Sequence, residues 1–131
     1  AALDRAAKLP DGAAAAALAR AQILFMHGDK KGAEKALGEL IKREPENAVA
    51  LSALGSVLAA DNRYKDSLSA FRRAAALAPG DPSLHYKLAI VLHDLGRDGE
   101  ARGECAIALA AAPGNPKVRE LMAAIGNRAP E

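Results

Sequence analysis

The sequence predicts an all-α fold made of short helix pairs, and three observations lead to this prediction. Half of the residues are hydrophobic and many of them are alanine, the strongest helix former, whereas aromatic residues are scarce. Apolar residues recur at three- and four-residue steps, and none of the runs alternates with polar residues as a strand would. Residues that end and start helices return every 34 positions. A regular array of helices accounts for all three features.

Proline marks the break between successive units of this array. Three prolines stand 34 residues apart, and each is followed two positions later by Asn or Asp. The prolines are Pro45, Pro79 and Pro113, and the residues that follow them are Asn47, Asp81 and Asn115. Asn and Asp are favoured at the N-cap, because the side-chain oxygen accepts an unsatisfied first-turn N–H. New helices are therefore expected to begin at residues 48, 82 and 116.

A second signal falls midway between the prolines. Gly28, Asn62 and Gly96 are also 34 residues apart. Gly and Asn are the residues that most readily adopt the left-handed conformation that ends a helix. Each unit is therefore predicted to be a helix, a left-handed stop, a second helix and a proline break.

These signals define the expected elements of a single domain that covers residues 1–131. In order, they are residues 1–10, the remnant second helix of a preceding unit; residues 14–47, 48–81 and 82–115, three full units; residues 116–127, a closing helix; and residues 128–131, a tail. The closing helix has apolar residues on one side, so it is expected to cover the last apolar face of the array. These residues are Val118, Leu121, Met122 and Ile125.

Small and large residues also recur with this period, as close helix crossings require. The small columns are Ala21, Gly55, Ala89 and Ala123, and then Ala33, Ser67 and Ala101. The large columns are Leu24, Leu58 and Leu92, and then Leu37, Phe71 and Cys105. We interpret Cys105 as a buried small hydrophobe because of its column.

This pattern resembles the tetratricopeptide repeat (TPR) family, whose unit is a helix–turn–helix of 34 residues. The middle unit carries the best match, at Leu51, Leu54, Gly55, Leu58, Tyr64, Ser67, Phe71, Ala74 and Pro79. The resemblance implies a TPR-type α-α superhelix, that is, a right-handed solenoid of antiparallel helix pairs, with about three full repeats and a C-terminal capping helix. It also implies a concave groove, lined by the first helices, in which such proteins bind peptides or partner domains.

The family pattern assigns groove positions within each repeat. Carried onto this chain, they are Leu18, Gln22, Phe25, Met26, Ser52, Ser56, Ala59, Tyr86, Lys87, Ile90, His93 and Asp94. The resemblance thus implies apolar anchors at Phe25, Met26, Tyr86 and Ile90, with polar groups that set the register. An amphipathic helix or an extended segment would suit such a groove.

One subtype of the family is not expected here. Members that bind chaperone tails hold a terminal carboxylate with several Lys, Asn and Arg side chains. The matching positions in this chain are Leu18, Gln22, Ala53, Ser83 and Lys87. Because only Lys87 keeps the required charge, acidic C-terminal tails are not expected to bind specifically.

Several other functions are disfavoured by the sequence. The formal net charge is +2 with no basic stripe, which argues against nucleic acid as a partner. No apolar run is long enough for membrane insertion, and a signal peptide is not evident. The histidines His27, His85 and His93 have no metal-ligand setting, and nothing supplies a base beside Cys105. We therefore predict a non-catalytic protein with no cofactor and no bound metal.

The leading hypothesis is a module that binds a protein or peptide, and two alternatives stay open. The array could assemble with itself as a homo-oligomer, or it could be the regulatory part of a larger transferase or secretion or assembly component. The alanine and arginine bias favours a GC-rich bacterial gene. The compartment is unassigned, with the cytoplasm favoured and the periplasm allowed if a signal sequence is missing here.

Overall fold

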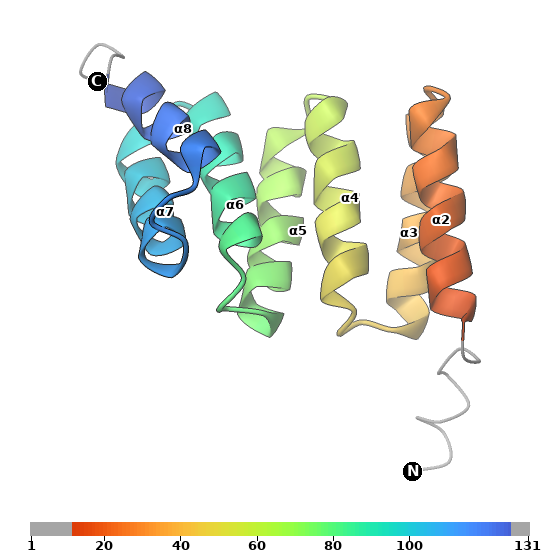
Figure 1. Ribbon diagram of the computed structural model, residues 1–131. Helices are drawn as coiled ribbons and strands as arrows, with labels where there is room; N and C mark the ends of the chain where they lie inside the picture. The colour runs from red at the N-terminus through yellow and green to blue at the C-terminus, as the bar shows by residue number, and fades with distance from the viewer. Residues whose placement is uncertain (1–11, 127–131) are drawn as a thin grey trace. The chain divides into compact units, whose positions relative to one another are not determined.

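The computed structural model describes residues 12–126, which form seven α-helices and no strand (Figure 1). The helices are α2 (Ala13–Met26), α3 (Lys30–Arg43), α4 (Ala48–Ala60), α5 (Tyr64–Leu77), α6 (Pro82–Asp94), α7 (Asp98–Ala111) and α8 (Pro116–Gly126). The predicted all-α fold is therefore confirmed. The remnant helix expected at residues 1–10 and the tail expected at residues 128–131 lie outside the described residues.

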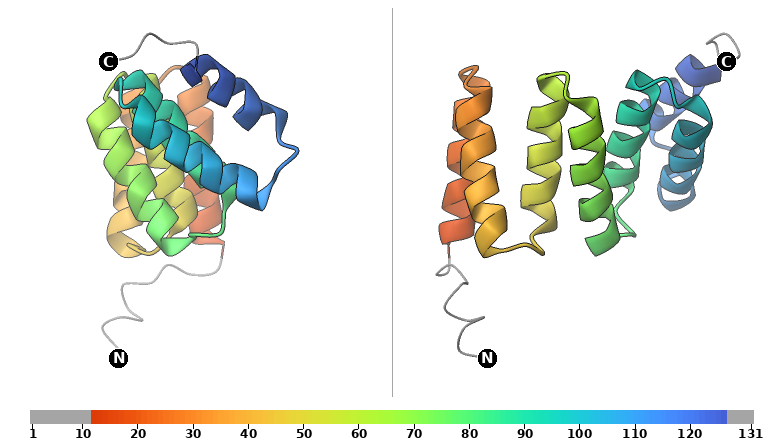
Figure 2. Two further views of the ribbon diagram at one scale, coloured as in Figure 1. Left: turned by 90° about the vertical axis from the view of Figure 1, so that its left-hand side faces the viewer. Right: turned by 180° about the vertical axis from the view of Figure 1, so that it is seen from behind.

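The chain divides into two compact units, Ala1–Leu77 and Ala78–Glu131. In the first unit, α2 packs on α3, α3 on α4, and α4 on α5, and in the second, α6 packs on α7 and α7 on α8. Figure 2 shows α4 and α5 running antiparallel side by side, and α6 and α7 doing the same. Antiparallel pairs of this kind bury one face of each helix. The repeat boundaries drawn from the sequence stay a prediction.

Helix starts follow the predicted capping residues. The side chains of Asn47, Asp81 and Asn115 each accept a hydrogen bond from a first-turn backbone N–H, at 3.0, 2.9 and 3.0 Å. Asp29 caps α3 in the same way at 2.8 Å, although the sequence pattern did not single it out. Each bond satisfies a donor that the helix itself leaves unpaired.

The turns inside the helix pairs are left-handed, as predicted. Gly28, Asn62 and Gly96 have φ angles of 86°, 61° and 79°. Asn62 is the only residue other than glycine with a positive φ in the part of the chain that the structure describes. Its side-chain oxygen also accepts a hydrogen bond from the Tyr64 hydroxyl at 3.0 Å.

We expect Asn62→Val to lower the free energy of unfolding by about 1–2 kcal/mol, because a β-branched residue is strained at positive φ. Asn62→Gly should change it by less than about 0.5 kcal/mol, since glycine adopts this conformation freely and the lost Tyr64 hydrogen bond is exposed. Urea unfolding followed by circular dichroism measures both variants. A large loss in the glycine variant would contradict this account of the turn.

The closest helix approach in the middle pair is at Gly55. An ideal Cβ built on Gly55 would lie 2.7 Å from the ring of Phe71, which is 2% exposed. The Ser67 hydroxyl donates to the Gly55 carbonyl at 2.7 Å, so this buried side chain is satisfied within the crossing. Small residues at Gly55 and Ser67 thus allow α4 and α5 to approach each other around Phe71.

The predicted small-residue columns are buried, with one exception in α8. Ala21, Ala89, Ala33, Ser67 and Ala101 are all at most 3% exposed. Ala123, placed in the first column, is exposed instead. The reason is that Val118 and Ile125, seven residues apart, form the buried face of α8. This part of the column prediction was wrong.

Candidate functional site

A pocket of about 200 Å³ opens between α2 and α4 in the first compact unit. Its lining residues are Leu18, Ala21, Gln22, Phe25, Leu37, Val49, Ala53 and Val57. Gln22 is the single polar side chain in this set, and it is exposed. We refer to this cavity as the α2–α4 pocket. Its composition, mostly apolar with one amide, is typical of a site that takes an apolar side chain and hydrogen-bonds its backbone.

Large apolar side chains are exposed next to this pocket. Ile23, Met26 and Val49 are 56%, 75% and 64% exposed, and they belong to α2 and α4. In the described part of the chain only two other large apolar side chains, Leu77 and Ile107, are as open to solvent. Exposed apolar residues that gather on one face commonly mark an interaction surface.

Helix α2 is itself unusual, because it is apolar around most of its circumference. Ala21 is its only buried residue, and Arg20 is its only charged one. A helix with this character is normally covered on more than one side. The open face of α2 therefore agrees with a surface that is completed by a partner.

The groove residues predicted on α2 are found at this pocket. Leu18, Gln22 and Phe25 line it, and Met26 is exposed on the same helix. On α4 the outcome differs, because Ser52 is only 8% exposed, and it is absent from the pocket lining.

The remaining predicted residues of α4 do not line the pocket either. Ser56 and Ala59 are half-buried. The residues of α4 that line the pocket are Val49, Ala53 and Val57, which follow one another at four-residue steps. That i, i+4 spacing was the signal available in the sequence, and it places all three on one side of the helix.

The predicted residues of the second compact unit all lie on α6. Tyr86, Lys87, Ile90 and His93 are half-buried, and Asp94 is exposed. The His93 Nδ1 lies 2.8 Å from the Oδ1 of Asp98, a residue that is 7% exposed. Because a carboxylate accepts, Nδ1 is the donor, and the hydrogen bond fixes the orientation of the ring.

The remaining histidine of interest, His85, is held in place by two acceptors. Its Nδ1 lies 2.7 Å from Glu104 and its Nε2 lies 2.9 Å from the Pro79 carbonyl. Burial lowers the pKa of His85, but the hydrogen bonds to Glu104 and Pro79 raise it further, so the net pKa is above the ordinary value. Both ring nitrogens are thus engaged in holding the turn before α6 against α7.

Cys105 is fully buried, as predicted, and burial raises the pKa of its thiol. A thiol with a raised pKa is a poor nucleophile at neutral pH. Residues 12–126 contain no group of three His, Cys, Asp or Glu side chains placed to hold a metal ion. Over the same residues, none of the helices has the length and apolar character that a membrane span requires.

Comparison with family models identifies tetratricopeptide repeats over most of this chain. One such model matches residues 58–125, and a second matches residues 27–82. None of the curated proteins with which the chain was compared matches it.

Solved TPR structures share the arrangement of the helices. The first TPR of Spaghetti (RPAP3), bound to the HSP90 peptide SRMEEVD, is 16% identical with a TM-score of 0.85, and the match covers 90% of this chain and 94% of that one. The Yersinia enterocolitica type III secretion chaperone SycD, in complex with a peptide of the translocator YopD, is 18% identical with a TM-score of 0.78, over 84% of this chain and 89% of that one.

A third similar structure is an enzyme of much greater length. The Thermobaculum terrenum O-GlcNAc transferase is 27% identical with a TM-score of 0.78, over 93% of this chain but only 22% of the transferase chain. The likeness therefore concerns the repeat fold and does not extend to most of that enzyme.

Proposed function

Because the chain belongs to the tetratricopeptide repeat family, we propose that it is an interaction module that binds an apolar segment of a partner protein at the α2–α4 pocket. The observation that carries this proposal is the coincidence of an apolar pocket with three exposed apolar side chains on the same two helices. Solved structures with a similar fold hold peptides, which supports the class of ligand.

The lining residues have distinct roles in this proposal. Phe25 and Leu18 from α2, together with Val49 from α4, surround one apolar side chain of the partner. Met26 and Ile23 extend the contact along α2, because both side chains are open to solvent. The Gln22 amide can donate to and accept from the partner backbone. In the second compact unit, Tyr86 and Ile90 on α6 would contribute further apolar contacts.

The chemistry of the pocket disfavours a terminal carboxylate as the group that it receives. Leu18 and Ala53 stand at positions where chaperone-tail binders carry cationic or amide side chains, and both line an apolar surface here. A buried carboxylate without several donors would be strongly disfavoured. The proposed ligand is therefore an internal apolar segment, in contrast to the acidic peptide of the first structure above.

We expect Val49→Glu to weaken binding by about tenfold or more, because it places a carboxylate at the mouth of an apolar pocket. Peptides selected on the wild-type chain from a displayed random library serve as ligands, and fluorescence anisotropy gives their Kd values. Phe25→Ala should weaken the same peptides by about 1–3 kcal/mol if Phe25 is an anchor.

Ile107→Glu is the matched control, since it introduces the same charge at an exposed apolar residue of α7 in the other compact unit. It should leave Kd within about twofold of the wild type, as expected for a surface substitution away from the site. Equal binding by Val49→Glu and wild type would sink the site assignment. If the chain instead assembles with itself, light scattering should show a mass that rises with concentration.

A further inference from the structure

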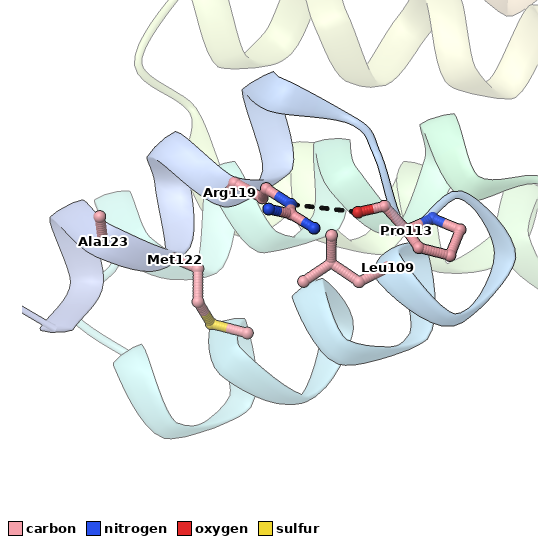
Figure 3. A pocket seen from close by; sticks show the side chains of 5 residues that line it. All are labelled: Leu109, Pro113, Arg119, Met122 and Ala123. Atoms are coloured by element: carbon pink, nitrogen blue, oxygen red, sulfur yellow. Dashed lines mark hydrogen bonds between the residues drawn. The ribbon is translucent and has the colours of Figure 1, made fainter.

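A second pocket lies between α7 and α8, away from every residue of the proposed groove (Figure 3). Its volume is about 430 Å³, and its lining residues are Leu109, Pro113, Arg119, Met122 and Ala123. Four of these are apolar, and Arg119 is the one charged group among them. We refer to this cavity as the α7–α8 pocket. It combines space for an apolar side chain with a fixed cation.

Arg119 is held in place from one side only. Its Nε donates to the Pro113 carbonyl at 3.1 Å, which fixes the plane of the guanidinium. The structure gives Arg119 no ion pair, and its two Nη groups have no partner within residues 12–126. Figure 3 shows the guanidinium above the Leu109 side chain, with Met122 on one side and Pro113 on the other. The open Nη groups therefore lie at the rim of the apolar surface.

This geometry is complementary to a carboxylate that is close to an apolar side chain. A guanidinium offers parallel N–H donors that match the two oxygens of a carboxylate. In an extended segment, residues i and i+2 project on the same side, about 6–7 Å apart along the chain. A leucine and an aspartate at this spacing could contact the apolar lining and the guanidinium together.

We propose that the α7–α8 pocket docks an extended segment of a partner protein in which an apolar residue and an acidic residue are two positions apart. The apolar side chain packs on Leu109 and Met122, and the carboxylate accepts hydrogen bonds from the Arg119 Nη groups. This site is independent of the α2–α4 pocket, so it stands or falls separately from the proposed function.

The test uses three capped pentapeptides and the complete chain, isotope-labelled for NMR. The probe is acetyl-Gly-Leu-Gly-Asp-Gly-amide, whose one charge is the aspartate. Acetyl-Gly-Leu-Gly-Asn-Gly-amide removes only the charge, and acetyl-Gly-Ala-Gly-Asp-Gly-amide removes only the large apolar group. We expect saturable shifts of the Leu109 and Met122 methyl signals with the probe, and binding at least about threefold weaker for each control peptide, as exposed charge pairs and single apolar contacts allow.

Variants of the chain separate the role of Arg119 from general charge. Arg119→Gln should reduce binding of the probe to the level of the asparagine peptide, while Lys117→Gln, which removes a positive charge from an exposed residue of α8 outside the pocket, should not. Thermal unfolding of both variants checks that the fold is kept. The proposal is overturned if the probe causes no saturable shift, if the asparagine peptide binds as well as the probe, or if Lys117→Gln and Arg119→Gln have the same effect.

Discussion

Replacement of Phe71 with alanine is expected to lower the free energy of unfolding by about 3–5 kcal/mol. Phe71 is 2% exposed, and its ring fills the space that Gly55 leaves between α4 and α5. Alanine would leave a cavity that these helices can close only in part, and the apolar contacts of the ring would be lost. Urea unfolding followed by circular dichroism at the helix band measures the change.

The effect of Phe71→Ala should also spread through the first compact unit. In an array of helix pairs, each pair is stabilised by its neighbours, so α3 should lose protection when α4 and α5 are weakened. Hydrogen exchange of the α3 amides detects this coupling. Arg73→Ala, at the exposed surface of the same helix, is the control and should change stability by less than about 0.5 kcal/mol. Equal stability of the two variants would contradict the core assigned here.

Features that depend on a few neighbouring residues were predictable from the sequence. The N-caps Asn47, Asp81 and Asn115 and the left-handed turn at Asn62 are determined by local hydrogen bonding and backbone sterics. The burial of Cys105 followed from its place in a periodic column. Local rules repeated at a fixed period thus defined the helices before any contact between them was known.

Features that depend on how two helices meet were not predictable to the same extent. The side of α4 that carries Val49 and Ala53 faces the pocket, whereas Ser52 is turned into the core. A rotation of α4 by about one residue, roughly 100°, is enough to exchange these roles. Likewise, Ala123 is exposed because α8 buries Val118 and Ile125 instead. The angle at which a helix packs is a tertiary property that periodicity alone does not determine.

Gly55→Ala should lower the free energy of unfolding by about 1–3 kcal/mol, although alanine is the better helix former. The new Cβ would lie 2.7 Å from the Phe71 ring, closer than van der Waals contact allows, so the ring or the helix must move. Gly38→Ala in α3 is the matched control, because nothing lies within 4 Å of the position of its Cβ. That variant should gain up to about 1 kcal/mol from helix propensity alone.

The clash also predicts how the two positions interact in a double-mutant cycle. Phe71→Leu removes ring atoms that the new Cβ meets, so Gly55→Ala should cost about 1 kcal/mol less in that background than in the wild type. The same cycle with Gly38→Ala in place of Gly55→Ala should be additive within about 0.5 kcal/mol. Additive behaviour of Gly55 and Phe71 would mean that the close crossing of α4 and α5 does not depend on the missing side chain. Coupling confined to this pair would instead show that glycine is retained at Gly55 for the space it leaves to the aromatic ring.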